Sequence, residues 1–151
     1  MSAALDLHDA LRGNYLMHGL SERQISEVAA LASTKNFMGG DVIVRQFAKD
    51  NDLMIVLSGR ARINGFSGEL IAEATSGSVI GEMSLIDDKP RSATVVAVGD
   101  STMMMIPNSK LWELMNSEPE IGKTILLNVS QILTARLRAA NVALDSVVDR
   151  D

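Results

Sequence analysis

Residues 81–95 read GEMSLIDDKPRSATV, a run with the residue types needed to bind an anion that also carries a hydroxyl group. The pair Val79–Ile80 before it is typical of a strand end, and Gly81 permits a tight turn. A short helix is expected to begin at Glu82, and free N–H groups at a helix N-terminus attract anions. Arg91, nine positions after Glu82, can add two parallel hydrogen bonds to the same anion, while the carboxylate can accept from a sugar hydroxyl. The segment therefore predicts a site for one ligand with both groups.

This segment belongs to a longer region, residues 36–106, that has the pattern of short strands. Apolar or alternating runs are separated by turn residues such as GGD at 39–41 and SG at 58–59. Many short strands at near-regular spacing predict a small barrel or a jelly-roll-like sandwich. The expected runs are 42–44, 53–57, 61–66, 70–74, 79–80, 93–98 and 103–106.

Helical periodicity is found on both sides of the strand region. Residues 5–34 are predicted to be helical, with a capping box formed by Ser21 and Gln24. Residues 108–147 predict two further helices, the second long and started by Ser117 as N-cap with an early proline. The expected fold is α+β, mainly β. It is an eight-stranded jelly-roll-like barrel flanked by N-terminal helices, a short helix after Gly81 and a long C-terminal helix, all in one domain, 1–151.

The long C-terminal helix is apolar on more than one side. Such a helix usually packs on its own domain and on something else. A homodimer interface and one broad intramolecular face both remain open as interpretations. The two rows are Leu126, Val129, Leu133, Leu137, Ala140, Leu144 and Val147, and Ile121, Ile125 and Ile132.

Composition narrows the functional classes. The 151 residues carry 14 Lys and Arg against 19 Asp and Glu, a net charge of −5, which argues against a broad basic surface for nucleic acid or anionic lipid. Without cysteine there is no disulfide, thiolate nucleophile or cysteine-bound zinc. No cofactor or metal is expected: the strand region lacks histidine, and the acidic pair at 87–88 is interpreted as a solvated turn.

The sequence also lacks the signals of an enzyme and of export. There is no Walker-type phosphate loop and no Gly-x-Ser-x-Gly motif, so we do not expect an enzyme. The N-terminus has no basic start followed by an apolar run, and no window approaches eighteen apolar residues. We therefore expect a cytoplasmic protein without a membrane segment.

Two of these stretches, GEMSL at 81–85 and PRSATV at 90–95, resemble the phosphate-binding cassette of cyclic nucleotide-binding domains. The resemblance extends over roughly residues 16–141. It includes GGDVI at 39–43, LMIVLSGRA at 53–61 and LTARLRAAN at 133–141. One departure is Phe47, which stands where the family often has a turn glycine, so the 44–52 turn is expected to be reshaped.

The resemblance implies a role for individual residues. Glu82 would bind the ribose 2′-hydroxyl and Arg91 the exocyclic phosphate of cyclic AMP or cyclic GMP. The rest of the phosphate cradle would be Gly81, Met83, Ser84, Ser92 and Ala93. The base and lid side would comprise Ile63, Ile71, Ala72, Ile80, Arg136, Ala140 and Asn141. Arg136 reads equally well as a solvated surface side chain, and Ala140 replaces a hydroxyl-bearing residue of the bacterial activators.

By this resemblance the chain is a cyclic nucleotide receptor, with cyclic AMP favoured and Ser92 leaving cyclic GMP open. Its C-terminal helix would move on binding and signal to an unidentified downstream protein. The apolar pattern of that helix favours a homodimer formed through it. We expect no DNA binding by this chain, because no helix-turn-helix sequence is recognised after the long helix. The alternatives are a sensory fragment of a longer protein, such as a DNA-binding regulator, and a degenerate scaffold that no longer binds. Against the scaffold, an empty pocket would leave Glu82 and Arg91 without partners.

Overall fold

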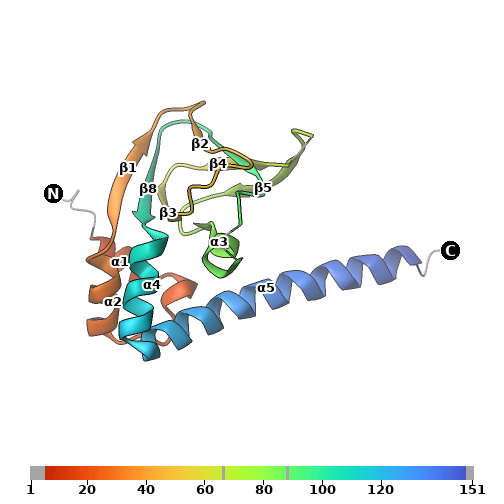
Figure 1. Cartoon of the computed structure of the whole chain (residues 1–151). Coiled ribbons are helices and arrows are strands. Elements are labelled where there is room, and N and C mark those ends of the chain that lie inside the picture. Colours follow the sequence, from red (N-terminus) through yellow and green to blue (C-terminus); the bar gives the residue numbers. More distant parts are fainter. Residues whose placement is uncertain (1–5, 66, 88, 149–151) are drawn as a thin grey trace.

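The computed structural model describes residues 6–65, 67–87 and 89–148, with residues 143–148 described as backbone only. Helices at both ends of the chain enclose one side of a strand region (Figure 1). The N-terminal elements are α1 (Leu7–Arg12), η1 (Tyr15–Met17) and α2 (Glu22–Ala29). The strands are β1 (Ser33–Phe37), β2 (Val42–Val44), β3 (Leu53–Ser58), β4 (Ala61–Asn64), β5 (Leu70–Ala74), β6 (Val79–Ile80), β7 (Thr94–Ala97) and β8 (Ser101–Ile106). The remaining helices are α3 (Glu82–Asp87), α4 (Asn108–Ser117) and α5 (Pro119–Val148).

The eight described strands form two antiparallel sheets. Their orders are β1-β8-β3-β6 and β2-β7-β4-β5. One apolar core lies between the first sheet and the helices, and a second gathers residues of both sheets. The α+β class is confirmed, but within the described ranges no strand pairing joins the sheets into a closed barrel. The expected eight-stranded barrel is therefore not confirmed.

The prediction of helix through residue 34 is wrong, because α2 ends at Ala29 and β1 begins at Ser33. β1 reads STKNF, and four of its five residues are exposed, so it has little of the apolar alternation that identifies a strand. Its conformation follows from pairing with β8, from Ser33 opposite Met105 to Phe37 opposite Ser101. The strand region therefore spans 33–106 rather than 36–106.

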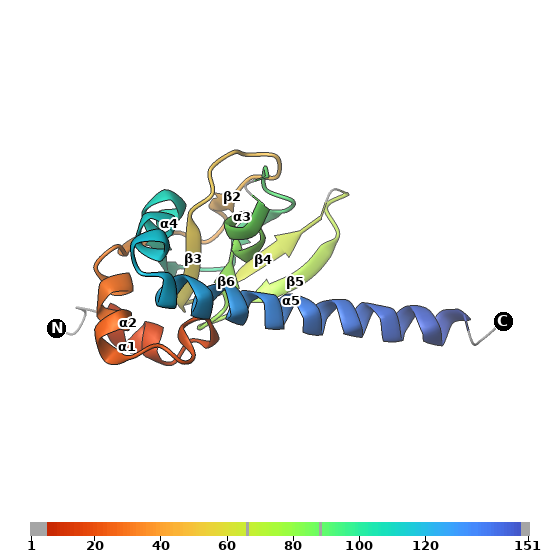
Figure 2. The ribbon, with the colours of Figure 1, turned by 60° about the horizontal axis from the view of Figure 1, so that its bottom comes forward.

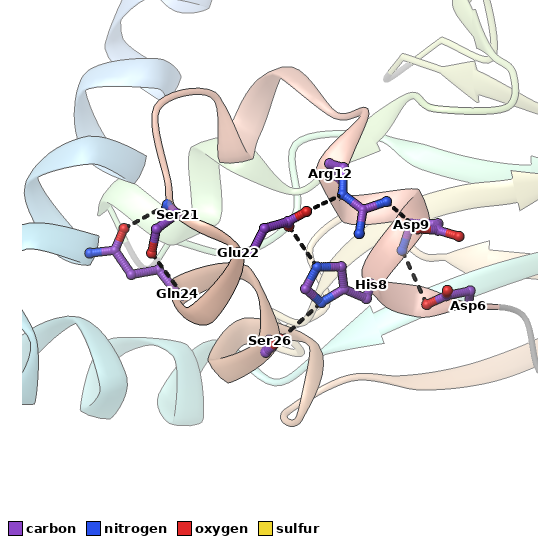
Figure 3. A network of polar contacts seen from close by, with 8 residues as sticks. All are labelled: Asp6, His8, Asp9, Arg12, Ser21, Glu22, Gln24 and Ser26. Atoms are coloured by element: carbon purple, nitrogen blue, oxygen red, sulfur yellow. Dashed lines mark hydrogen bonds and ion pairs between the residues drawn. The ribbon is translucent and has the colours of Figure 1, made fainter.

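The N-terminal helices are joined by polar contacts (Figure 3). The capping box of α2 is confirmed, since Ser21 and Gln24 exchange side-chain and backbone hydrogen bonds. From α1, His8 Nε2 lies 2.8 Å from a carboxylate oxygen of Glu22, and Arg12 Nε donates to the other oxygen at 2.8 Å. These two hydrogen bonds hold the pKa of Glu22 below its ordinary value.

The start of α5 differs from the prediction. Ser117 is not its N-cap: it is the last residue of α4, and its hydroxyl donates to the carbonyl of Leu114 at 3.1 Å. The carbonyl of Glu118 instead accepts from the amide of Gly122, so Glu118 precedes the first turn of α5 and Pro119 is its first residue. Proline suits that place because the amide it lacks has no partner within a helix.

The two halves of α5 have different surroundings. Ile121, Ile125 and Val129 are fully buried in the helical core, and the buried amide of Asn128 donates to two carbonyls at η1. Residues 134–142 are exposed, and the C-terminal half of α5 runs out beyond the strands (Figure 2). Leu144 and Val147 fall among the residues whose side chains are not described. None of the helices in the described ranges has the length and apolar character to cross a membrane.

Candidate functional site

A cavity of about 450 Å³ lies where the second sheet, α3 and α5 meet. In Figure 1, α3 is seen between the strands and α5. The volume is within the usual range for small-molecule sites. Twelve predicted site residues line it: Ile63, Ile71, Ala72, Ile80, Gly81, Glu82, Met83, Ser84, Arg91, Ser92, Ala93 and Arg136.

Two predicted residues are not part of the cavity, and three lining residues were not predicted. Ala140 and Asn141 are exposed on the projecting half of α5 and do not line it. Val44, Val79 and Val95 line it as well, although their strand pattern is that of ordinary core residues. No sequence signal separates these valines from the rest of the core.

The turn at Gly81 brings β6 close to Arg91. Gly81 has φ +98°, and a Cβ atom there would lie 2.6 Å from Nη1 of Arg91 and 3.1 Å from the carbonyl oxygen of Asp52. The first hydrogen bond of α3 runs from the amide of Leu85 to the carbonyl of Gly81, so the amides of its first turn precede the helical bonding pattern. A glycine at this position lets the guanidinium lie directly against the turn.

Arg91 is a buried cation with incomplete hydrogen bonding. It is only 4% exposed, and Nη2 donates to the carbonyl of Asp52 at 2.8 Å and lies 3.5 Å from a carboxylate oxygen of Asp50. Among the residues described, its Nε is one of two buried side-chain nitrogen or oxygen atoms that lack a hydrogen-bond partner. A buried donor without an acceptor is unfavourable, so an anion in the cavity would improve its environment.

The β2–β3 loop forms hydrogen bonds with the backbone of Arg91 and Ser92. The amide of Arg91 donates to the carbonyl of Ala48 at 2.9 Å, and the amide of Phe47 donates to the carbonyl of Arg91 at 2.8 Å. Gln46 Nε2 donates to the carbonyl of Ser92 at 3.1 Å. Phe47 has φ +70°, the one positive value among described residues other than glycine. Phenylalanine here adopts the left-handed conformation that glycine adopts more easily.

Glu82, also buried, is paired with Arg136 of α5. Arg136 is therefore not simply a solvated surface side chain: it links the cavity to the long helix, 54 positions away in sequence. Tyr15 of η1 lies near this ion pair. Burial, followed by the negative charge of Glu82, raises the pKa of Tyr15, and Arg136 acts in the opposite direction.

Helix α4 holds the other side of α3. The buried amide of Asn108 donates to the carbonyl of Ser84 at 3.2 Å, and the indole of Trp112 donates to the carbonyl of Leu85 at 3.0 Å. Both acceptors are backbone carbonyls of the short helix beside the cavity. The position of α3 is therefore fixed by hydrogen bonds from the helix that leads into α5.

The charged residues of the cavity have protein partners, which corrects one part of the sequence argument. Glu82 is paired with Arg136, and Arg91 with Asp50 and the carbonyl of Asp52. Their presence alone therefore does not argue against a scaffold that has lost its ligand. The incomplete hydrogen bonding of the Arg91 guanidinium is the stronger argument, because it leaves a buried donor at the cavity without an acceptor.

The acidic turn after α3 contains a local hydrogen bond in its described part. Asp87 accepts a hydrogen bond from the amide of Lys89 at 3.1 Å, as in an ordinary turn. Asp88 lies outside the described residues. Across the described ranges, no group of three or more His, Cys, Asp or Glu residues is arranged to hold a metal ion.

Comparison with known proteins identifies the family of the chain. The family model of the cyclic nucleotide-binding domain matches residues 34–118. The chain is 28% identical over 139 residues to the cyclic AMP receptor protein of Thermus thermophilus, covering 89% of this chain and 62% of the relative. The crystal structure of the catabolite activator protein of Thermus thermophilus superposes with a TM-score of 0.77 at 27% identity, covering 89% of this chain and 63% of that one.

A second curated relative is much larger. Glutaminase 1 of Bradyrhizobium diazoefficiens is 27% identical over 144 residues, which is 94% of this chain but 23% of the relative. The chain thus spans less than two thirds of both curated relatives.

Proposed function

Since the chain belongs to the cyclic nucleotide-binding domain family, we propose that it is a non-catalytic receptor for a cyclic nucleotide, with cyclic AMP preferred over cyclic GMP. The observation that carries the proposal is the buried Arg91 guanidinium at the cavity, whose Nε lacks a partner. A cyclic phosphate supplies negatively charged acceptors in the plane of that fork. Relatedness to a cyclic AMP receptor protein supports the choice of nucleotide.

Phosphate binding would rearrange contacts around Arg91. The carboxylate of Asp50, 3.5 Å away in this structure, competes for the same guanidinium edge. A phosphate that approaches more closely would replace this weaker ion pair, while the bond to the Asp52 carbonyl can remain. The β2–β3 loop, which already holds both backbone groups of Arg91, would keep the guanidinium in place.

The ribose and base would contact the other charged pair. Glu82 accepts from Arg136 in this structure, and a carboxylate has enough acceptor sites to bind a ribose hydroxyl as well. The apolar residues Ile63, Ile71 and Ala72 would cover the base. Ligand binding would therefore change the contact between Glu82 and Arg136, which joins α5 to the cavity, as well as the conformation of residues 81–93.

Movement at the cavity has a second route to α5. Asn108 and Trp112 hold the carbonyls of α3 from α4, and α4 packs against the start of α5. At that contact, a Cβ atom on Gly122 would lie 3.0 Å from the carbonyl oxygen of Met115, so the two helices approach closely. A shift of α3 would move α4, and α4 would in turn move α5. A downstream protein that binds α5 would sense this movement.

We propose that the chain forms a homodimer in which the projecting half of α5 packs against a second copy. Leu137 is 62% exposed, and Leu133, Leu137 and Ala140 follow four- and three-residue steps along the helix. Such steps are those of a coiled-coil seam. Sedimentation velocity should give a dimer for the parent chain and a monomer for Leu137→Glu, whereas Lys123→Glu, on an exposed part of the same helix, should stay dimeric. A monomeric parent at high micromolar concentration, with and without nucleotide, contradicts the dimer.

Calorimetric titration with cyclic AMP and cyclic GMP tests the binding proposal. Charge-assisted hydrogen bonds contribute about 1.5–3 kcal/mol each, so Arg91→Ala should weaken binding by roughly one to two orders of magnitude. Arg60→Ala is the matched control, because Arg60 is exposed and paired with Glu73 at 3.7 Å, away from the cavity residues. Undiminished affinity in Arg91→Ala contradicts the phosphate assignment.

The scaffold alternative is tested by the same titration. Protein verified to be free of nucleotide that releases no heat with either ligand favours the scaffold. The other alternative is a sensory unit that acts within a larger protein, and it is supported by relatives such as Glutaminase 1, of which this chain covers only part.

A further inference from the structure

The methionines of the chain differ sharply in their exposure. The chain has nine, and eight lie in the described ranges. Five of these are buried and Met105 is partly buried in the core between the sheets. The two exceptions are Met38, which is 71% exposed, and Met83, which is 50% exposed. An oxidant in solvent therefore has direct access to these two thioethers and much less to the other six in the described ranges.

Met83 is the exposed methionine that borders the cavity. It is the second residue of α3, directly after Glu82, and it lines the cavity together with apolar residues such as Ile71 and Ala72. A ligand whose phosphate lies at Arg91 and whose ribose lies at Glu82 would cover this side chain. Met38, by contrast, is not among the residues that line the cavity.

We infer that Met83 is a site of reversible oxidation through which peroxides weaken ligand binding, an inference that rests on the proposed function. The thioether sulfur attacks one oxygen of hydrogen peroxide. A sulfur–oxygen bond forms and the oxygen–oxygen bond breaks. Sulfur loses two electrons and becomes the sulfoxide, while the peroxide is reduced to water after proton transfer. A methionine sulfoxide reductase returns the thioether, with two thiols oxidised to a disulfide and the sulfoxide oxygen released as water.

Oxidation would change the chemistry of the cavity wall. The sulfoxide is polar and bulkier than the thioether, and its oxygen needs a hydrogen-bond donor when a ligand covers it. The neighbouring carboxylate of Glu82 only accepts hydrogen bonds. We expect affinity for the cyclic nucleotide to fall about tenfold, which corresponds to about 1.4 kcal/mol. Conversely, bound nucleotide should shield Met83 from peroxide.

The experiment treats the full chain with hydrogen peroxide, locates sulfoxides by peptide mass spectrometry and measures cyclic AMP affinity by calorimetry. Among the eight methionines in the described ranges, Met83 and Met38 should be oxidised first, and the reductase should restore affinity. Saturating cyclic AMP should slow oxidation of Met83 and leave that of Met38 unchanged. Met83→Leu should keep its own affinity after peroxide, whereas Met38→Leu should lose affinity as the parent does.

The outcomes separate this inference from the proposed function. If untreated protein binds no nucleotide, the proposed function fails. If untreated protein binds and the affinity is unchanged once Met83 is oxidised, the inference is overturned. It is also overturned if Met38 is oxidised while Met83 is not, or if Met83→Leu loses affinity to the same extent as the parent.

Discussion

Replacement of Gly81 by alanine tests the close approach between the turn and the buried guanidinium of Arg91. The new Cβ atom would lie 2.6 Å from Nη1, well inside van der Waals contact, and the φ of +98° is unfavourable for any residue with a side chain. The backbone carbonyl of Asp52, 3.1 Å from the same position, limits how the turn can adjust. We therefore expect the guanidinium to be displaced from its hydrogen bond to that carbonyl.

The magnitude has two parts. Left-handed backbone in an alanine costs about 1–2 kcal/mol. Loss of the charge-assisted hydrogen bond from Arg91 to Asp52 adds about 1.5–3 kcal/mol. We expect the free energy of unfolding to fall by about 2.5–5 kcal/mol in Gly81→Ala, and nucleotide affinity to fall at least about tenfold, because displacement of Arg91 removes a phosphate contact.

Gly40 provides the matched control. Its φ is +92°, almost that of Gly81, but no heavy atom lies within 4 Å of its Cβ position. Gly40→Ala should therefore show the backbone contribution alone, about 1–2 kcal/mol, with unchanged affinity. Urea denaturation followed by circular dichroism gives the stabilities and calorimetry the affinities. Equal loss of stability in both variants, with full binding retained in Gly81→Ala, would refute the argument.

Three further changes test other parts of the structure. Phe47→Gly should raise the free energy of unfolding by about 0.5–1 kcal/mol in urea denaturation, because glycine adopts a positive φ without strain but loses more backbone entropy; a loss of stability would contradict this. Asn128→Ala should cost about 1–3 kcal/mol in the same assay, since it removes the donor to the buried carbonyl of Leu16 and to the part-buried carbonyl of His18, and a change below the measurement error would show that they find other partners. The pKa of Glu22 is lowered by His8 and Arg12, so its stabilisation is present above the unfolded pKa and is lost as pH falls through the folded one. Melting temperatures from pH 6 to pH 3 should therefore fall less steeply in Glu22→Gln, and identical slopes would contradict the assignment.

The cassette could be predicted because its information is local. A glycine turn, a carboxylate and an arginine nine positions later lie in one short segment, and the structure brings them to one cavity. The strand region and the long helix were found for the same reason, since each has its own periodicity.

The features that could not be predicted from the sequence depend on contacts between segments that are far apart in the chain. β1 is a polar run that becomes a strand by pairing with β8, about 70 positions away. The pairing of Glu82 with Arg136 and the hydrogen bonds from α4 to α3 likewise join segments that no local pattern connects. The role predicted for Ala140 and Asn141 stays a prediction, because both lie outside the cavity in a single copy of the chain.

The projecting half of α5 makes this helix a lever. Its thirty residues, at 1.5 Å each, give a length of about 45 Å, and only the first part is clamped in the core. A tilt of about 10° at the Pro119 end would sweep the far end through about 8 Å. Arg136, which pairs with Glu82, is seventeen residues or about 26 Å from Pro119, so a shift of one or two ångströms applied there would be nearly doubled at the end of the helix. The α4–α5 junction sets the position of the pivot. It therefore determines the ratio between the displacement at the C-terminal end of α5 and the displacement at the cavity.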